Sequence, residues 1–331
     1  MSPEKKLITV VIPHRASETI DATLEALERA RAQAVARGKK RAAAVEVLAV
    51  SGNQPSVQRN RAVREAGGEY IYFLDNDSEP APDCLARIAD FFAGHKEAAI
   101  YGGPSLTPAT DSRAQKAFGH VLGSFIGTAF MSARYRPAGT LRPTTDRELI
   151  LCNLAFRRSV FLELGGFDEK LYPNEENDLM DRTRLAGYGL WYDPELVVRR
   201  SQRPGLAAFI RQLFGYGRGR AEQMKNSPLA SNLVPFVFML FPLAVLALPF
   251  LVALAPVTGL AAAAYVAVTG LAALPALARG AGTAALAWLA FFLCHFSYGA
   301  GLWAGLVLPY RSRSVRPQSR LKRIALKGRR A

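Results

Sequence analysis

The chain of 331 residues has few cysteines, and two long stretches of it lack charge of one or both signs. Its three cysteines lie far apart, which excludes a disulfide scaffold and indicates buried thiols in a reducing compartment. Arg279 is the only charged residue between positions 233 and 308, and residues 309–331 hold nine basic residues and no acidic one. These two stretches divide the chain into a soluble part, an apolar part and a cationic tail.

The whole chain is nevertheless strongly basic, with a net charge of +15, while half of it is apolar. This combination excludes a disordered polymer and a purely soluble nucleic-acid binder. No base-reading module accompanies the basic residues, so we expect the tail to bind anionic membrane lipids and not nucleic acid. A short polar N-terminus followed by a strand-like run does not match a signal peptide, which predicts that the soluble part stays in the cytosol.

The soluble part alternates strand and helix patterns. Residues 7–13, 45–50 and 70–74 are apolar, β-branched runs, typical of strands buried on both faces. Helical periodicity separates them over 19–41 and 56–66. This alternation predicts an α/β fold with a mainly parallel sheet flanked by helices, and a nucleotide site at the carboxyl ends of the strands.

The same patterns continue toward residue 204. We expect further strands over 99–102, 149–156 and 196–198, and further helices over 81–92, 158–164 and 177–186. The segment 104–146, rich in glycine, serine, threonine and proline, is interpreted as an acceptor-side loop region.

The apolar part divides into three segments, 233–255, 257–278 and 283–308. Each approaches or exceeds the ~20 residues that cross a hydrocarbon core, so we predict a helical membrane region. Three crossings would put the soluble part and the basic tail on opposite sides, whereas the positive-inside tendency favours both in the cytosol. Either one segment is re-entrant or interfacial, or the tendency is broken here.

Asp75-Asn76-Asp77 directly follows the apolar strand over 70–74. Two carboxylates one residue apart at a strand exit can share Mg²⁺ or Mn²⁺ with the oxygens of a diphosphate. Because aspartate and asparagine are also common in turns, a plain turn is the alternative interpretation.

Further features surround this tripeptide in a fixed order: the strand that ends at Pro13, Gln58-Arg59-Asn60, Gly165-Gly166-Phe167-Asp168 and Glu175-Glu176-Asn177-Asp178-Leu179. With these motifs the sequence resembles the family 2 glycosyltransferases of the GT-A fold over about residues 7–200. Its membrane-anchored, exopolysaccharide-type branch would extend the resemblance to the C-terminus.

The resemblance implies a nucleotide-diphospho-sugar transferase fold and a role for each matching residue. Asp75 and Asp77 stand at the DxD motif, which implies a metal site, and Asn76 lies there beside the sugar nucleotide. Arg59-Asn60 matches the family's Arg-Asn, which implies contact with the sugar nucleotide; a solvated helix face is the alternative for Arg59.

The acidic motif implies the catalytic residues Glu175, Glu176 and Asp178. Glu176 occupies the position of the family's general base, where aspartate is usual, and would accept the proton of the acceptor hydroxyl. The alternative is an acidic first turn favoured by the helix dipole.

The chain departs from the family's pattern at two places where the resemblance implies contact with the nucleotide. Where the family has Asp-Gly-Ser after its second strand, this chain has Ser51-Gly52-Asn53, so Ser51 or Asn53 would bond the base instead. After Pro13, which we also place at the nucleotide sugar, the chain has His14-Arg15, and Arg15 is expected near the phosphates.

Residues 205–232 mix apolar and basic side chains, which predicts an amphipathic segment at the membrane interface. We expect Gln212, Tyr216, Arg218 and Arg220 on its acceptor side. Gln212 lacks the tryptophan of the processive synthases' Gln-x-x-Arg-Trp motif, which argues against processive synthesis.

The sequence therefore predicts a catalytic domain (1–204), an interfacial segment (205–232), a membrane region (233–308) and a basic tail (309–331). The predicted protein is an inverting glycosyltransferase of the cytoplasmic membrane, multi-pass, with its catalytic domain in the cytoplasm. It would move a sugar from a nucleotide diphosphate sugar to a lipid-linked acceptor. The alternatives are a polyprenyl-phosphate glycosyltransferase and a non-catalytic membrane assembly subunit.

Overall fold

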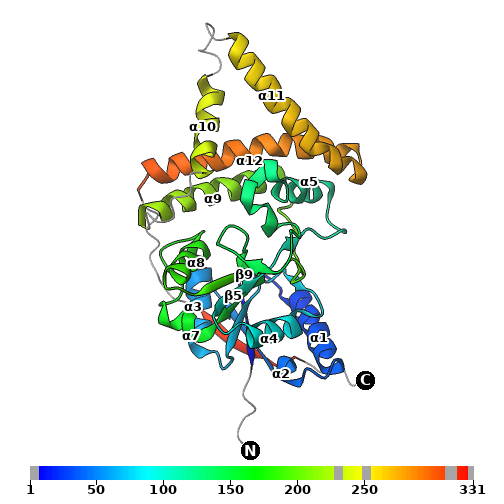
Figure 1. The fold of residues 1–331 in the computed structure, drawn as a ribbon, viewed down its shortest axis with the longest axis vertical. Helices are drawn as coiled ribbons and strands as arrows, with labels where there is room; N and C mark the ends of the chain where they lie inside the picture. The colour runs from blue at the N-terminus through cyan, green and yellow to red at the C-terminus, as the bar shows by residue number, and fades with distance from the viewer. Residues whose placement is uncertain (1–6, 227–233, 248–254, 310–318, 327–331) are drawn as a thin grey trace, which may run out of the picture. The chain divides into compact units, whose positions relative to one another are not determined.

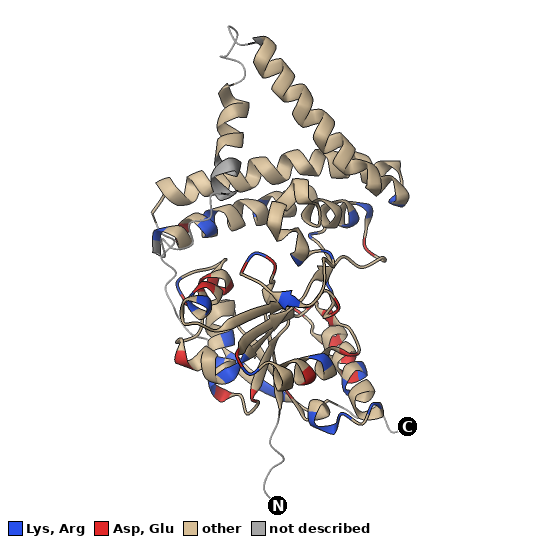
Figure 2. Ribbon diagram, in the orientation of Figure 1, with Lys and Arg blue, Asp and Glu red and all other residues tan. Residues whose placement is uncertain are grey.

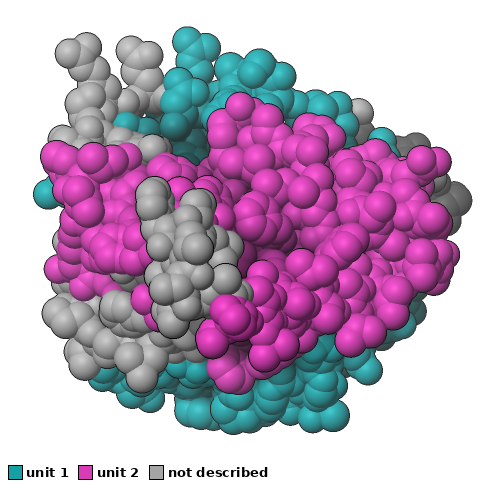
Figure 3. All heavy atoms as spheres, turned by 90° about the horizontal axis from the view of Figure 1, so that it is seen from above, with its two compact units in different colours: residues 1–106, 133–200, 313–331 teal, residues 107–132, 201–312 magenta. Residues whose placement is uncertain are grey.

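The computed structural model describes residues 7–226, 234–247, 255–309 and 319–326 (Figure 1). The chain divides into two compact units, coloured separately in Figure 3. Unit 1 comprises residues 1–106, 133–200 and 313–331, and unit 2 comprises residues 107–132 and 201–312. The chain thus leaves unit 1 twice and returns to it twice, the second time at its C-terminal end.

In its described residues, unit 1 is built on a sheet of eight strands. They are β1 (Ile8–His14), β2 (Val45–Ser51), β3 (Tyr70–Phe73), β5 (Ala98–Gly102), β7 (Arg142–Pro143), β8 (Leu154–Arg157), β9 (Gly189–Tyr192) and β11 (Arg320–Ile324). Their order across the sheet is β11-β2-β1-β3-β8-β5-β9-β7. The first part of the strand predicted over 149–156 is instead a 3₁₀ turn, η2 (Leu151–Asn153).

The sheet is mixed, which corrects the prediction of a mainly parallel one. β1 pairs in parallel with β2 and β3, and β5 with β9. β8 runs antiparallel between β3 and β5, and β7 and β11 are antiparallel edge strands. An apolar run predicts a buried strand but not its direction, so sequence pattern could not distinguish these cases. The parallel part, β2-β1-β3, is where the predicted site lies.

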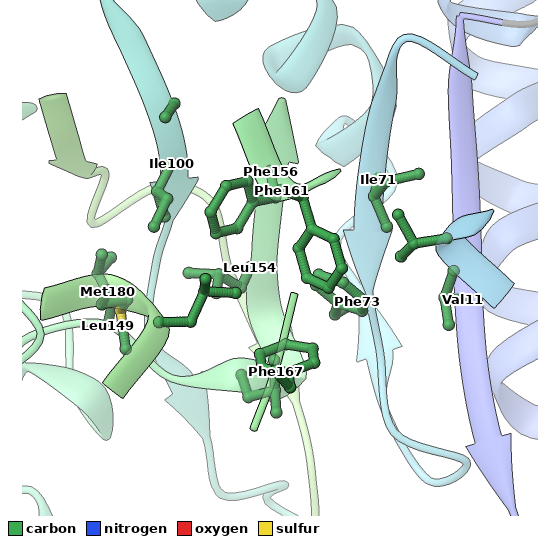
Figure 4. Close-up of a cluster of buried hydrophobic side chains, with 14 of the residues drawn as sticks. Val11, Ile71, Phe73, Ile100, Leu149, Leu154, Phe156, Phe161, Phe167 and Met180 are labelled. Carbon is green, nitrogen blue, oxygen red and sulfur yellow. The ribbon is translucent and has the colours of Figure 1, made fainter. Parts of the chain in front are cut away.

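Helices cover both faces of this sheet: α1 (Asp21–Ala36), α2 (Lys40–Ala43), α3 (Pro55–Glu65), α4 (Cys84–Gly94), α7 (Arg158–Glu163) and α8 (Glu175–Leu185). Alternate residues of each strand point to opposite faces. Val11 and Phe73 therefore belong to a buried cluster that includes residues of α3, α7 and α8. Figure 4 shows Phe161 of α7 beside Phe73, and Met180 of α8 beside Leu149. The other face packs against α1 and α4. Burial on both faces explains the continuous apolar runs.

A second, smaller sheet joins β4 (Glu79–Pro80), β10 (Val198–Arg199) and β6 (Ser105–Leu106), with β10 in the middle. β10 is antiparallel to β4 and parallel to β6. β4 begins two residues after Asp77. The pairing of β10 with β4 therefore brings Arg200, the residue after β10, to the segment Asp75-Asn76-Asp77, which we call the DxD turn.

Unit 2 is helical in its described residues: α5 (Arg113–Leu122), α6 (Phe125–Thr128), η1 (Ala129–Arg134, ending in unit 1), α9 (Leu206–Asn226), α10 (Val234–Ala247), α11 (Ala255–Ala273), η6 (Leu274–Arg279) and α12 (Ala281–Val307). Figure 2 shows α10 to α12 almost free of charged residues. His295 of α12 bonds to the Tyr265 hydroxyl and to the carbonyl oxygen of Ile126, both at 2.8 Å. These bonds tie α6 and α11 to α12.

Two helices in the described part of the chain are long and apolar enough to cross a membrane, Pro256–Arg279 and Ala281–Val307. They correspond to the second and third predicted membrane segments. Within the first, 233–255, α10 has 14 residues, a length of about 21 Å against a hydrocarbon core of about 30 Å. Residues 233 and 248–254 of that segment lie outside the described residues.

The predicted interfacial segment contains α9, which packs closely against α12. A Cβ atom at Gly217 would lie 2.1 Å from the carbonyl oxygen of Tyr298, and one at Gly301 would lie 2.1 Å from that of Phe214. Glycine at both positions therefore allows the two backbones to approach each other directly. One face of α9 is thus buried within unit 2.

The basic tail contains a strand that the sequence did not indicate. β11 pairs antiparallel with β2, from Arg320 opposite Ser51 to Ile324 opposite Val47. Arg323 Nη1 also lies 2.7 Å from the Glu46 carboxylate. The tail residues 310–318 and 327–331 lie outside the described residues.

Candidate active site

The carboxyl ends of three adjacent parallel strands meet at one edge of the unit 1 sheet. The register pairs His14 of β1 with Ser51 of β2, and Val11 of β1 with Phe73 of β3. Asp75 therefore follows β3 next to the loops that leave β1 and β2. This is the edge at which an open α/β sheet binds its ligands.

The tripeptide Asp75-Asn76-Asp77 forms a fixed turn at this edge. The Asp75 N–H donates to Ser78 Oγ at 3.2 Å, and the Ser78 N–H donates to the Asp75 carbonyl oxygen at 3.2 Å. The Thr23 hydroxyl of α1 donates to the Asn76 carbonyl oxygen at 2.9 Å. The backbone is thus anchored on both sides, while the side chains of Asp75 and Asp77 are 21% and 47% exposed.

Arg59 of α3 joins this turn to the acidic helix α8. Its Nη2 lies 2.9 Å from Asp75 Oδ1 and its Nη1 3.2 Å from Glu175 Oε1, and its side chain is only 6% exposed. The prediction placed Arg59 at the diphosphate. In the structure its guanidinium holds two carboxylates together.

Arg200 is a residue of the site that sequence reasoning missed. Its Nη2 lies 3.2 Å from Asp75 Oδ2 and its Nε 2.8 Å from Asp77 Oδ1. No motif marks Arg200, which is 123 residues from Asp77 in the chain. The one available signal was the pair Arg199-Arg200, which follows the strand predicted over 196–198.

Glu175 is buried beside Arg59, and its Oε2 has no hydrogen-bond partner among the described residues. Burial raises the pKa of Glu175 to about 8, and repulsion by Glu176 adds to that increase. The cation Arg59 acts in the opposite direction, but the loss of hydration outweighs it. Glu175 therefore carries a proton through much of the neutral pH range.

Glu176, the predicted base, is only partly buried, so its carboxylate is accessible to a ligand. The Asn177 amide donates to Glu176 Oε1 at 3.4 Å and to Asn174 Oδ1 at 3.0 Å. Arg134 in turn donates to Asn177 Oδ1 at 2.7 Å. These contacts fix the first turn of α8 and with it the direction of Glu176.

The third predicted catalytic residue, Asp178, bonds along its own helix. Asp178 Oδ2 accepts from Arg182 Nε at 2.9 Å. Arg182 also donates to the carbonyl oxygens of Leu164 and Gly166 at 2.6 and 2.7 Å. Asp178 therefore orients the side chain of Arg182, which holds α8 against the turn at Gly165-Gly166.

Asn60, predicted at the sugar nucleotide, contacts protein backbone in the structure. Its amide nitrogen donates to the Phe167 carbonyl oxygen at 2.8 Å, and its Oδ1 accepts from the Phe167 N–H at 2.9 Å. The same nitrogen lies 3.0 Å from Glu169 Oε1. These bonds hold α3 against the turn that precedes α8.

The other predicted nucleotide residues lie on the loops that follow β1 and β2. Gln58 holds these loops together, because its amide donates to the carbonyl oxygens of Val50 and, at 3.1 Å, His14. Pro13 is buried, Ser51 is half-buried, and Arg15 and Asn53 are exposed. The polar side chains are therefore available to a ligand at the sheet edge.

The predicted interfacial and acceptor residues lie on α9, in unit 2. Gln212 donates to the Tyr216 hydroxyl at 2.7 Å, and Arg218 to Glu222 at 2.9 Å. Arg220 is buried and donates to Gln223 Oε1 at 3.2 Å.

The donor set at the turn fits a hard divalent cation. Asp75 and Asp77 offer carboxylate oxygens, which Mg²⁺ and Mn²⁺ prefer. The described residues hold no group of three or more His, Cys, Asp and Glu side chains that could bind a metal. A cation on two carboxylates would complete its coordination with water and phosphate oxygens, as Mg²⁺ commonly does in proteins.

A profile of the glycosyl transferase family group 2 matches residues 70–304, well over half of the chain. The chain belongs to this family. The matched region of this family 2 glycosyltransferase begins at β3 and includes the DxD turn, the acidic helix and α9 to α12. The family predicted from the motifs is thereby confirmed.

Two curated relatives match the glycosyltransferase over part of their length. It is 28% identical to the succinoglycan biosynthesis protein ExoA of Rhizobium meliloti (strain 1021) over 189 residues, 56% of this chain and 53% of that protein. It is 26% identical to the pre-mycofactocin glycosyltransferase of Mycobacterium tuberculosis (strain CDC 1551 / Oshkosh) over 174 residues, 53% of this chain and 36% of that protein. The matches thus span about half of the relatives' length or less.

The fold resembles that of the mannosyltransferase PcManGT from Pyrobaculum calidifontis, solved in complex with GDP-Man and Mn²⁺. The TM-score is 0.52 at 19% sequence identity, over 92% of this chain and 88% of that one. This likeness confirms the predicted GT-A-type fold.

Proposed function

We propose that this family 2 glycosyltransferase transfers a sugar, with inversion, from a nucleotide diphosphate sugar to a lipid-linked acceptor in cell-surface polysaccharide or glycolipid synthesis. The observation that carries the proposal is the linkage of Asp75 to Glu175 through Arg59, which joins the DxD turn to the helix bearing Glu176. The donor class is supported by GDP-Man in PcManGT, and the polysaccharide role by the succinoglycan relative.

In this mechanism Glu176 acts as the general base. Its carboxylate accepts the proton of the acceptor hydroxyl while that oxygen bonds to the anomeric carbon of the donor. The bond between this carbon and the diphosphate oxygen breaks, and the nucleoside diphosphate leaves. Asp75 and Asp77 would hold Mg²⁺ or Mn²⁺, which when bound offsets the negative charge of the leaving diphosphate.

The neighbouring residues position these groups. Arg59 fixes Asp75 against Glu175, while Asp178 and Asn60 fasten α8 and α3 to the intervening turn. Arg15, Ser51 and Asn53 are the proposed contacts of the nucleotide.

We place the acceptor at the cytosolic face of the cytoplasmic membrane. The candidate membrane helices Pro256–Arg279 and Ala281–Val307 support membrane attachment. Contact of the acceptor with Gln212, Tyr216, Arg218 and Arg220, and of the basic tail with anionic lipids, stay predictions.

The test is a panel of nucleotide diphosphate sugars given to the full-length protein in detergent, with a lipid extract, in Mn²⁺, Mg²⁺ or EDTA. We expect one sugar to enter the lipid fraction only with metal, and Asp75→Asn with Asp77→Asn to abolish transfer. Transfer to purified polyprenyl phosphate alone would favour the polyprenyl-phosphate alternative. If no donor binds or reacts under any condition, a non-catalytic role replaces the proposal.

A further inference from the structure

Arg200 bridges the two carboxylates that are the proposed metal ligands, at 3.2 Å from Asp75 Oδ2 and 2.8 Å from Asp77 Oδ1. Its backbone is fixed, because the Arg200 N–H donates to the carbonyl oxygen of Leu106 at 3.0 Å beside the three-stranded sheet. The long side chain can therefore change its contacts while the main chain stays in place.

Arg59 also contacts Asp75, but it is held differently. Its side chain is 6% exposed and bonds to Glu175 as well, whereas the side chain of Arg200 is 21% exposed. Moving the Arg59 side chain away would leave the buried carboxyl group of Glu175 without its hydrogen-bond donor. Arg200 is thus the cation that can leave the turn without opening the interior of unit 1.

A divalent cation and a guanidinium compete for the same oxygens. A cation held by Asp75 and Asp77 would have to share their carboxylate groups with Arg200, and two cations within a few ångströms repel each other. A nucleoside diphosphate brings negative charge, and guanidinium groups bond well to phosphate oxygens. The ligand that arrives with the metal therefore offers Arg200 a replacement for the carboxylates it loses.

We propose that Arg200 holds the place of the metal between Asp75 and Asp77 and exchanges these carboxylates for the diphosphate when both ligands bind. The inference rests on the proposed function. Its consequence is that the metal alone binds weakly, and that metal and nucleotide diphosphate strengthen each other's binding through Arg200.

The experiment measures Mn²⁺ binding to the full-length protein in detergent by electron paramagnetic resonance, without nucleotide and with UDP or GDP. In the wild type we expect the bound nucleotide to increase Mn²⁺ affinity about tenfold or more, within the usual range of coupling between two sites. In Arg200→Gln, Mn²⁺ alone should bind about tenfold tighter than in the wild type, and the increase caused by nucleotide should shrink correspondingly.

Arg199→Gln is the matched control, because Arg199 is the exposed residue that precedes Arg200 at the end of β10, and its replacement should leave both affinities unchanged. Arg200→Lys keeps the charge and should lie between wild type and Arg200→Gln, and thermal unfolding verifies that each variant is folded. Unchanged or weaker binding of Mn²⁺ alone in folded Arg200→Gln overturns the inference. Failure of the wild type to bind UDP or GDP with any metal overturns the proposed function instead, and the nucleotide-free measurement still tests Arg200.

Discussion

Arg59 Nη1 and Glu175 Oε1 lie 3.2 Å apart, although 116 residues separate them in the chain. Both side chains are buried, and they connect α3, which follows β2, to the first turn of α8. The same guanidinium reaches Asp75, so one side chain sets the spacing between the DxD turn and the proposed base.

We expect Arg59→Met to destabilise unit 1. Removing Arg59 leaves Asp75 and the buried Glu175 without the hydrogen-bond donor that they share, and a buried polar group left without a partner costs about 1–3 kcal/mol. Glu175 already carries a proton near neutral pH, which places the loss at the lower end of that range. Urea unfolding followed by fluorescence measures the effect, with Arg64→Met, an exposed arginine on the same helix, as the control. Equal losses in the two variants would contradict the structural role of Arg59.

Glu176→Gln should lower turnover by roughly 10²–10⁴-fold, the usual contribution of a positioned general base. Binding of the donor, measured by calorimetry, should be retained, since the variant keeps the shape of the side chain. If turnover falls only a few fold, the acceptor needs little help from a base, as a lipid phosphate would.

The raised pKa of Glu175 predicts a pH dependence of stability. Burial moves this pKa from its usual value of 4.5 to about 8, so between these values the folded protein holds a proton that the unfolded chain releases. The free energy of unfolding should therefore decrease as pH rises from about 5 to 8. Urea unfolding in EDTA at several pH values measures this slope, and Glu175→Gln should flatten it. Parallel curves for the variant and the wild type would refute the assignment.

Gly301→Ala should separate α9 from α12. The added Cβ would lie 2.1 Å from the carbonyl oxygen of Phe214, so at least one backbone must shift. Overpacking of this kind costs about 1–3 kcal/mol or more, which thermal unfolding in detergent would detect. The control is Gly259→Ala on α11, where nothing lies within 4 Å of the added atom. A loss of the same size in both would show that the close packing is unimportant.

Much of unit 1 could be predicted from the sequence because its signals are local. The apolar runs that form β1, β2 and β3 gave the strands to within a residue or so, and Pro55 marks the start of α3. The DxD turn was identified for the same reason, since its carboxylates directly follow a strand.

The remaining features depend on contacts between distant residues. The direction of β8, the pairing of β11 and the ion pair of Arg200 with Asp77 are set by which segments meet in space, and no local pattern encodes that. The acidic motif at residues 175–179 also could not show which of its three acidic side chains is accessible to a ligand. Glu175 is buried beside Arg59, and Asp178 bonds to Arg182. Among the described residues, Glu176 is the one of the three that forms no ion pair.

The pairing of β11 with β2 constrains the path of the chain through any bilayer. In the described part of the chain, β2 precedes the apolar helices α10, α11 and α12 and β11 follows them, yet the two strands share one sheet. A chain that starts and ends on the same side of a membrane crosses it an even number of times. Two passages, matching the two candidate helices Pro256–Arg279 and Ala281–Val307, satisfy this parity, and three do not.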